Sequence, residues 1–452
     1  MKKNDEYYTK KNIIRKKYRF YMIRIFFAVL LGVGFIGLLF PLRPKESDIE
    51  KRTLTKFPKP TVSTFFNGEF FGDISTWYAD TFPFREGLMK ANSKFKKTYG
   101  ITKEEIHGEV VEGDAIPEPD AIITSTPEPT ATPTETENPQ ATPTPATGTA
   151  ATIHVEPEKA GTIYVAENRG FELFGFNLEG TDQYINMMNA LAGDLNGTAN
   201  LYDILVPTSI GVNLDAENQQ KIGSSDQRKM FEYVYGHLDP SIKQVHVLDT
   251  LIEHNDEYLY FNTDHHWTAD GAYYAYVEFM KAKGGTPAPL SSYTRNEYPG
   301  FIGSFYSYSE QSDALKNNPD TVVTYTPQVN TMTYTDINGS QITGQVVADP
   351  TDYSAANKYL CFIAGDQPYL RIDNPNITDG SSCVIVKESY ANAFIPFLVN
   401  SYQTVHVVDY RYYPGNLISL VQENHIQDVI YLNNSNALLQ SSAKQMNRII
   451  GR

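Results

Sequence analysis

The sequence predicts an α/β fold in which helices flank a largely parallel sheet, together with an N-terminal transmembrane helix. From Gly161 onward, short runs rich in β-branched residues alternate with amphipathic runs, a pattern typical of strands joined by helices. Near the N-terminus an uncharged apolar run, "IFFAVLLGVGFIGLLFPL" at 25–42, would extend roughly 27 Å as a helix, which is enough for the core of a bilayer.

Composition and charge narrow the class of protein. The 452 residues are 41% hydrophobic and 13% aromatic, as expected for a folded chain with one or two full cores. Residues 1–24 carry nine Lys and Arg residues and two acidic residues, a net charge of +7. Because the whole chain has a net charge of −15, the remaining residues have a net charge of −22. Such an acidic body repels phosphate, which argues against nucleic acid as its partner.

The first 42 residues are predicted to form a basic cytoplasmic tail (1–24) and a single-pass membrane anchor (25–42). Clustered Lys and Arg before an apolar run hold an N-terminus in the cytoplasm, so the remaining chain is expected outside it. A cleaved signal peptide is the competing interpretation, but the sequence continues Pro-Leu-Arg-Pro (41–44), without a small-x-small cleavage site. This favours an uncleaved anchor.

Residues 43–105 are predicted to be an extracytoplasmic, helical juxtamembrane region. Apolar residues recur at helical spacing around Trp77, Tyr78 and Leu88, and "DTFP" at 80–83 is expected to separate two amphipathic helices.

The following segment, 106–160, is Thr/Pro-rich, with "PEPTATPTETENPQATPTPATG" at its centre. Such a composition cannot bury enough apolar surface to order itself, which predicts a disordered, solvated stretch. Both flanks have strand-like composition, so the segment is either a long insertion within a hairpin or a linker between domains.

Residues 161–452 are predicted to be the α/β domain. The predicted strands are 201–207, 245–249, 358–364, 383–389, 404–409 and 428–434. The predicted helices are 181–192, 224–237, 271–283, 391–402 and 415–426. The polar stretch 284–357 is expected to form irregular loops or a small β-insert.

The two cysteines, Cys361 and Cys383, both lie in apolar runs that resemble strands. An export compartment would permit a disulfide between them, and two buried core thiols are the alternative. Without a CxxC pair, a thiolate metal site is excluded.

One serine lies where a strand is expected to turn into a helix. In "CVIVKESYANAFIPFLV", a buried strand ends at Lys387-Glu388-Ser389 and a helix is expected to begin near Ala391. This places Ser389 at the carboxyl edge of the sheet, where open α/β folds bind ligands, beside the backbone N–H groups of a helix start. Ser389 could be a nucleophile or simply the N-cap of that helix.

The stretch "FNTDHHWTADG", 261–271, gathers an acid, two histidines and a tryptophan before a predicted helix. A serine nucleophile needs a base, and the base needs an orienting acid. Asp264 and His266 could supply both if the loop doubles back, with Trp267 as a wall beside the imidazole. The second histidine, His265, could merely bond a carbonyl. Metal binding by Asp264, His265 and His266 is the rival interpretation, although the other histidines lack ligand spacing.

These residues resemble a known family. "TDHHWT" followed downstream by "KESYAN" is similar to the DHHW proteins of Gram-positive bacteria, a family related to the SGNH-hydrolase-like domain of alginate O-acetyltransferases. Further similar segments are "DTFPFR" (80–85), "NRGFELFGF" (168–176), "ILVPTS" (204–209), "GDQP" (365–368) and "VVDYRYY" (407–413). The resemblance covers most of 47–452 apart from the Thr/Pro-rich segment, and it implies an SGNH-hydrolase-like fold.

The resemblance also implies roles for single residues. The family's Asp-x-His-Trp pattern falls on Asp264, His266 and Trp267, and its serine block falls on Ser389. That block reads Lys-Glu-Ser here, so Lys387 replaces the glycine that helps to form the oxyanion hole in SGNH enzymes. Lys387 could stabilise an oxyanion or point away.

Oxyanion and substrate contacts are expected from two further segments. The loop "AGDQP" could supply oxyanion donors from Gly365 or Gln367, and Arg411 could bind substrate or form a surface ion pair.

The resemblance implies a membrane-anchored, extracytoplasmic Ser-His-Asp enzyme that needs no cofactor. Transfer of an acetyl group to a cell-surface polysaccharide is the expected reaction, with a membrane-bound O-acyltransferase as acyl donor partner. A carbohydrate esterase of the same fold and a non-catalytic cell-wall or glycan-binding protein are the alternatives.

Overall fold

A computed structural model describes residues 152–452 and 113–117, with shorter pieces nearer the N-terminus. These pieces are residues 24, 43–44, 46–47, 52–54, 56–60, 70, 74, 77–78 and 81–84. The predicted anchor at 25–42, the tail before Arg24, and most of the Thr/Pro-rich segment therefore lie outside the described residues. Among the helices of the described part, none is both long and apolar enough to cross a membrane. The anchor stays a prediction.

The chain divides into two compact units, Met1–Lys103 and Glu104–Arg452. In the first, β1 (Glu46–Ser47) pairs antiparallel with β2 (Arg52–Thr53). Trp77 lies in a helix and is buried, with the Arg43 guanidinium 3.7 Å above its ring centre. Residues 81–84 form a turn after this helix, at the predicted break.

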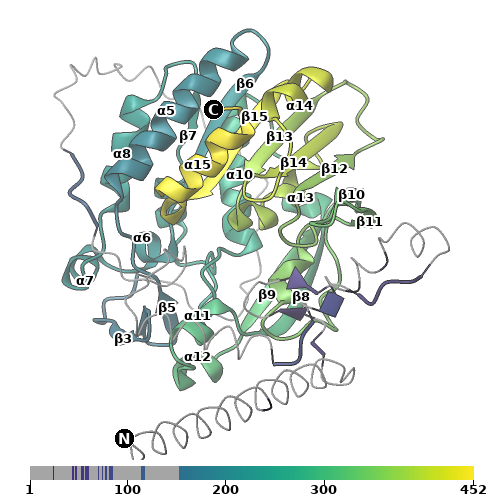
Figure 1. The fold of residues 1–452 in the computed structure, drawn as a ribbon. Coiled ribbons are helices and arrows are strands. Elements are labelled where there is room, and N and C mark those ends of the chain that lie inside the picture. The colour runs from purple at the N-terminus through teal and green to yellow at the C-terminus, as the bar shows by residue number, and fades with distance from the viewer. Residues whose placement is uncertain are drawn as a thin grey trace, which may run out of the picture. The chain divides into compact units, whose positions relative to one another are not determined.

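The second unit contains an eight-stranded sheet in the order β11-β10-β12-β14-β13-β15-β6-β7 (Figure 1). Its strands are β6 (Asn200–Val206), β7 (Lys243–Val245), β10 (Thr331–Thr335), β11 (Gln341–Gln345), β12 (Tyr369–Asp373), β13 (Ser382–Lys387), β14 (Thr404–Asp409) and β15 (Asp428–Asn434). Neighbours from β14 through β7 pair in parallel, whereas β12, β10 and β11 extend the sheet antiparallel. This confirms the mixed α/β class with a largely parallel centre.

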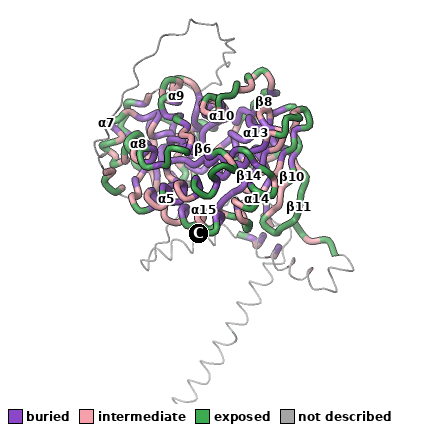
Figure 2. Tube along the Cα trace, turned by 90° about the horizontal axis from the view of Figure 1, so that it is seen from above, coloured by how far each residue is buried: buried purple, intermediate pink, exposed green. Residues whose placement is uncertain are grey.

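Helices cover both faces of the sheet. On one side lie α5 (Leu178–Leu195), α14 (Leu417–Glu423) and α15 (Gln440–Ile449), and on the other α9 (Leu248–Glu253), α10 (Ala269–Lys283) and α13 (Ile395–Leu398), as the view from above shows (Figure 2). Because both faces are covered, every residue of the central strands β13 and β15 is buried, with an apolar run in the middle of each strand and polar residues towards its ends. The remaining helices here are α6 (Ser209–Asn213), α7 (Ala216–Lys221) and α8 (Gln227–His237).

Three predicted elements are wrong in part. The strand predicted at 245–249 ends at Val245, because α9 begins at Leu248 and buries its apolar residues. The strand predicted at 358–364 is a 3-10 helix, η3 (Lys358–Cys361), followed by left-handed backbone at Ile363 and Ala364 that no strand can hold. The helix predicted at 391–402 is a 3-10 turn, η4 (Ser389–Ala393), and then the short α13. Proline is confined to a first helical turn, so Pro396 begins a new helix instead of continuing η4.

The polar stretch 284–357 forms strands and short helices as well as loops. Strand β8 (Thr294–Phe301) pairs antiparallel with β9 (Asp320–Thr326), while β10 and β11 form a hairpin at the end of the main sheet. The short helices here are η2 (Leu290–Ser292), α11 (Ser304–Tyr308) and α12 (Asp313–Lys316). A separate sheet joins β3 (Glu158–Ala160), β4 (Ile163–Ala166) and β5 (Arg169–Phe171).

Both cysteines are buried and free. Cys383 lies in β13 as predicted, but Cys361 lies in η3. Burial raises the pKa of both thiols, which therefore behave as small core side chains and not as reactive thiolates.

Candidate active site

The carboxyl end of β13 turns sharply into η4, and this turn carries Ser389. The side chain of Glu388 caps η4: its Oε2 accepts a hydrogen bond from the Tyr390 N–H at 3.0 Å, while Oε1 accepts one from the Asn434 N–H at 3.1 Å. The N-cap interpretation of Ser389 is therefore wrong, because the preceding residue holds that position. The Ser389 Oγ lies 3.3 Å from the same Glu388 Oε2, so this carboxylate is one acceptor for the hydroxyl, and His266 offers a second, closer one.

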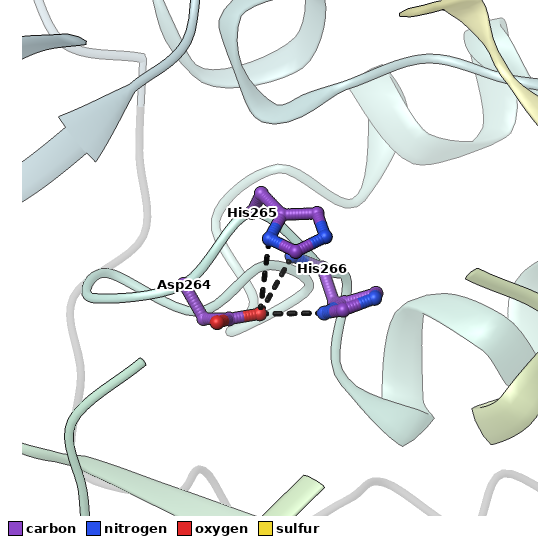
Figure 3. Close-up of side chains that lie close together, drawn as sticks. All are labelled: Asp264, His265 and His266. Carbon is purple, nitrogen blue, oxygen red and sulfur yellow. Dashed lines mark hydrogen bonds and ion pairs between the residues drawn. The ribbon is translucent and has the colours of Figure 1, made fainter. Parts of the chain in front are cut away.

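The loop before α10 doubles back on itself. Tyr260 and Trp267 form an antiparallel bridge, the Phe261 N–H donates to the His266 carbonyl at 3.2 Å, and Thr268 caps α10 through the Gly271 N–H. Asp264, His265 and His266 occupy the tip of this loop. The fold-back brings side chains two residues apart into contact (Figure 3).

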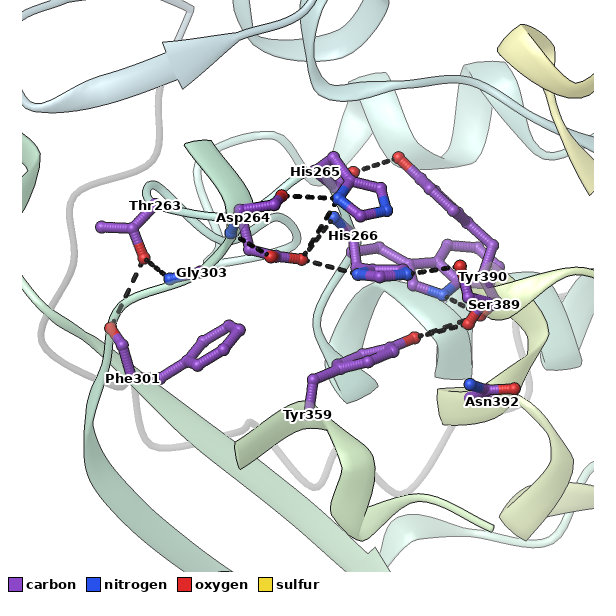
Figure 4. Close-up of polar contacts among 12 residues, drawn as sticks. Thr263, Asp264, His265, His266, Phe301, Gly303, Tyr359, Ser389, Tyr390 and Asn392 are labelled. Atoms are coloured by element: carbon purple, nitrogen blue, oxygen red, sulfur yellow. Dashed lines mark hydrogen bonds and ion pairs between the residues drawn. The ribbon is translucent and has the colours of Figure 1, made fainter. Parts of the chain in front are cut away.

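Asp264, His266 and Ser389 form a continuous hydrogen-bonded chain (Figure 4). The Asp264 Oδ1 lies 2.6 Å from the His266 Nδ1, and the His266 Nε2 lies 2.8 Å from the Ser389 Oγ. All three residues are buried, Ser389 the least so with 9% of its surface exposed. The distances and the order acid–imidazole–hydroxyl are those that activate a serine nucleophile.

The second oxygen of Asp264 is held by a segment that the sequence did not single out. The Ser304 N–H donates to the Asp264 Oδ2 at 2.7 Å. Gly303 lies so close that a Cβ added there would be 2.6 Å from the Asp264 Cγ, so the carboxylate needs glycine at this position. Gly303 and Ser304 follow β8 closely, and their distance along the chain from Asp264 concealed the contact.

Aromatic rings pack around the His266 imidazole. Tyr359, from η3, stacks on it with ring centres 4.0 Å apart and planes 16° apart, and the Tyr359 hydroxyl donates to the Ser389 carbonyl at 3.1 Å. Trp267 packs against Tyr390 and donates from Nε1 to the Tyr390 carbonyl at 2.7 Å. Trp267 thus joins the loop to η4, and the ring that stacks on the imidazole belongs to Tyr359.

The His265 side chain lies against the His266 ring and a serine hydroxyl. Its ring lies 3.8 Å from that of His266, and its Nδ1 lies 2.7 Å from the Ser304 Oγ. Asp264, His265 and His266 offer ligand atoms within 4.8 Å of one another, so a metal could be considered. A metal on these atoms would have to displace the bond between Asp264 and His266, and Ser389 already holds the other His266 nitrogen. The contacts fit an acid–base chain better than a metal centre.

Lys387 and Arg411 join a buried cluster of four charges. The Lys387 Nζ lies 2.8 Å from the Asp366 Oδ1 and 3.0 Å from the Asp409 Oδ2, and Arg411 contacts the same two carboxylates. Burial raises the pKa of Asp366, but the charges of Arg411 and Lys387 outweigh it and hold that pKa below its usual range. The ion pair considered for Arg411 is therefore present and is partly buried, with 18% of the Arg411 side chain exposed.

The two loop residues predicted as oxyanion donors flank Asp366. Gly365 has left-handed backbone with φ of 74°, and the Gln367 Nε2 donates to the Ala364 carbonyl at 2.9 Å. The Asn392 Nδ2, from η4, also donates to Asp366, at 3.1 Å. The loop is thus joined to the serine-bearing turn through one carboxylate.

Glu172, just beyond β5, is a buried acid near the site that the sequence did not single out. Burial raises its pKa to about 8, a hydrogen bond from Asn436 opposes this, and the charges of Asp264 and Glu388 reinforce it. Glu172 is therefore protonated at neutral pH. It lies within the "NRGFELFGF" segment, which was the one available signal.

Comparison with known proteins identifies the family. The DHHW protein family matches residues 50–126 and 131–408, which is more than half of the chain. The chain belongs to the DHHW protein family. This confirms the family resemblance drawn from "TDHHWT" and "KESYAN". No curated protein matches the chain.

Two solved structures share the fold, and a third is only weakly similar. A DHHW family protein from Eubacterium siraeum is 26% identical, covers 63% of this chain and 94% of that one, and superposes with a TM-score of 0.58. Bacillus cereus PatB1 with a sulfonyl adduct is 20% identical, covers 62% and 97%, and gives a TM-score of 0.53. The O-acetyltransferase domain of Pseudomonas putida AlgJ is a weaker match, with 13% identity, coverage of 60% and 91%, and a TM-score of 0.34.

Proposed function

We propose that this DHHW protein is a Ser-His-Asp acyltransferase of SGNH-hydrolase-like fold, with Ser389 as nucleophile. The observation that carries the proposal is the hydrogen-bonded chain from the Asp264 carboxylate through both His266 nitrogens to the Ser389 hydroxyl. Glu388 supports it, because it takes the N-cap position of η4 in place of Ser389, and the Ser389 Oγ lies closer to the His266 Nε2, at 2.8 Å, than to the Glu388 Oε2, at 3.3 Å.

The proposed reaction has two half-reactions. The Ser389 Oγ attacks the carbonyl carbon of an acyl ester while the His266 Nε2 takes its proton, and the carboxylate of Asp264 stabilises the imidazolium. Collapse of the tetrahedral intermediate leaves an acyl-serine, and His266 returns the proton to the departing alcohol. A second hydroxyl then loses its proton to His266, attacks the acyl-serine and frees Ser389. A sugar hydroxyl in this step gives transfer, and water gives hydrolysis.

The oxyanion donors are proposed to come from the loop with Gly365 and Gln367 and from the backbone at the start of η4. Lys387 has two carboxylate partners, so its charge is largely neutralised within the buried cluster. We assign it the role of fixing the Asp366 loop against β13. Arg411 holds the same carboxylates from β14, and its substrate contact would use the part of the guanidinium that faces solvent.

The setting of the reaction follows from the sequence. The predicted anchor at 25–42 would hold the enzyme at the outer face of the cell membrane, where a cell-surface polysaccharide is the proposed acceptor and acetyl the proposed group. A membrane-bound O-acyltransferase is the proposed source of that group.

An ester assay with a serine-directed reagent tests the proposal. The full chain would be assayed with 4-nitrophenyl acetate beside Ser389→Ala and His266→Ala, with and without a chelator. PatB1 has been solved with a sulfonyl adduct. We expect a sulfonyl fluoride to modify Ser389 of this chain, detected as added mass on the peptide that contains it.

Activity that both substitutions abolish and the chelator leaves intact would support the triad. Activity lost to the chelator would favour the metal interpretation instead. Equal rates in the wild type and Ser389→Ala, without any adduct on Ser389, would refute nucleophilic catalysis and favour a glycan-binding role.

A further inference from the structure

A buried carboxylate outside the triad organises the loop that carries Asp264. Asp320, the first residue of β9, is 3% exposed and accepts four hydrogen bonds. Its Oδ1 accepts from the Tyr258 hydroxyl and, at 2.9 Å, from the Asn262 N–H. Its Oδ2 accepts from the Thr263 N–H at 2.7 Å and from the Thr263 Oγ1 at 2.5 Å.

Thr263 also accepts hydrogen bonds from the segment that holds Asp264. The Thr263 Oγ1 accepts a hydrogen bond from the Gly303 N–H at 3.0 Å, and the Thr263 carbonyl accepts one from the Phe305 N–H at 2.9 Å. Between these two anchored positions, the Ser304 N–H donates to the Asp264 Oδ2. Thr263 therefore contacts both β9, through Asp320, and the segment with Gly303, the second of which is seen in Figure 4.

The composition of this network argues against an incidental contact. Within residues 152–452 Asp320 makes no direct ion pair, so four hydrogen bonds, together with the charge of the nearby Arg169, compensate for burying its carboxylate. Burial raises the pKa of Asp320, and the bonds from Thr263 and Tyr258 oppose that rise. A buried carboxylate is costly compared with an apolar side chain of similar volume, so a role in fixing geometry explains its presence better than stability does.

We propose that Asp320 and Thr263 are positioning residues that set the Asp264 carboxylate against His266 by way of Gly303 and Ser304. This inference rests on the proposed function for its catalytic meaning. Neither residue touches the reacting atoms. Their effect passes through the distance and angle between the Asp264 Oδ1 and the His266 Nδ1, now 2.6 Å.

The hydrogen bond between Asp264 and His266 can be followed independently of turnover. The proton that joins the Asp264 Oδ1 to the His266 Nδ1 gives an NMR signal whose position depends on the separation of the two atoms. Moving Asp264 away lengthens this charge-assisted bond, so the signal should move upfield.

The test compares Thr263→Val with Thr263→Ser in the full chain. Valine is isosteric but lacks the hydroxyl that bonds Asp320 and Gly303, whereas serine keeps it. Asp428→Asn serves as a control distant from the site, because Asp428 is a buried carboxylate that accepts from Tyr402, Asn200 and Lys283 at the opposite, amino end of β15. The readouts are kcat and KM for 4-nitrophenyl acetate and the NMR signal of the proton between Asp264 and His266.

For Thr263→Val we expect kcat to fall about 10- to 100-fold with KM little changed, since sub-ångström to ångström misplacement of catalytic groups costs that much. The NMR signal of the proton between the Asp264 Oδ1 and the His266 Nδ1 should move upfield. Thr263→Ser should recover most of the activity, and Asp428→Asn should lower only the melting temperature.

Wild-type kcat and an unmoved NMR signal of the Asp264–His266 proton in Thr263→Val would overturn the positioning role, as would an equal loss in Asp428→Asn. Failure of the proposed function itself would appear separately, as unchanged activity in Ser389→Ala. In that case the NMR signal of this proton still decides whether Thr263 positions Asp264.

Discussion

Replacing Gly303 by alanine should damage catalysis far more than it damages the fold. The added methyl would lie 2.6 Å from the Asp264 Cγ and closer still to its Cβ and Oδ2. Gly303 has φ of −84°, so the backbone itself tolerates alanine and the conflict is purely one of space. Because β8 and the Ser304 N–H fix the segment on one side, the carboxylate is the group expected to move.

The magnitude follows from the overlap. Carbon atoms rest at about 3.5–4.0 Å, so the Asp264 carboxylate has to retreat by about 1 Å. A misplacement of that size in catalytic geometry costs about 100-fold in rate, or about 2.7 kcal/mol of transition-state stabilisation. The free energy of unfolding should fall by about 1–3 kcal/mol, as for other overpacked buried sites.

The assay is kcat for 4-nitrophenyl acetate with a parallel melting curve. Gly236→Ala, in the last turn of α8 with open space around it, is the control and should gain up to about 1 kcal/mol of stability without a change in rate. A Gly303→Ala enzyme with wild-type kcat would refute the claim that the Asp264 position governs the reaction. A kcat loss in Gly236→Ala would show that the assay responds to something other than the site.

Three further changes have definite expected outcomes. Glu172→Gln should stabilise the fold most at high pH. The pKa of Glu172 in the folded protein, about 8, lies above the unfolded value of 4.5, so the wild type loses up to a few kcal/mol of stability as pH rises between these values. Glutamine should remove this loss, which urea titrations at pH 5 and 9 would measure. His406 is buried against Tyr369, and burial lowers its pKa to about 4, so the folded state loses stability as pH falls from about 6.5 to 4. His406→Gln should flatten this part of the curve of stability against pH. An unchanged slope would contradict the lowered pKa of His406. Tyr359→Phe should keep the stack on His266 but lose the bond to the Ser389 carbonyl, costing about 1 kcal/mol in melting experiments with little change in rate, whereas Tyr359→Leu should also lower kcat.

The sequence predicted the parts of the site that short spacings encode. Asp264 and His266 stand two residues apart before a capped helix, and Ser389 follows directly after an apolar strand, so both could be placed at loop tips from local patterns alone. Their meeting also required the sheet order, in which β13 lies at the centre between β14 and β15. The α/β alternation implied such a sheet but not which strand would occupy its middle.

Each site contact that the sequence did not reveal joins two segments that lie far apart along the chain. Tyr359 lies in a run, "KYLCFIA", whose β-branched and aromatic residues are typical of a strand, yet the structure has a 3-10 helix there. The left-handed backbone at Ile363 and Ala364 explains the difference, because it turns the chain and carries the ring onto His266. Packing around the imidazole outweighs the local preference for a strand, and no propensity scale registers that contact.

The Lys-Glu-Ser block shows how a departure from a family pattern can be compatible with the same chemistry. A serine at a helix start normally uses its hydroxyl to cap the helix, which would compete with its use as a nucleophile. Here Glu388 supplies the cap, and Lys387 turns into the cluster with Asp366 and Asp409. The two residues before Ser389 thus have partners of their own, and the hydroxyl remains directed at His266. Glu388→Gln, which keeps the acceptor oxygen but not the charge, should therefore retain the turn. Glu388→Ala should let Ser389 cap η4 and reduce the reaction with a sulfonyl fluoride by at least tenfold, and full reactivity of Glu388→Ala would show that the cap is irrelevant.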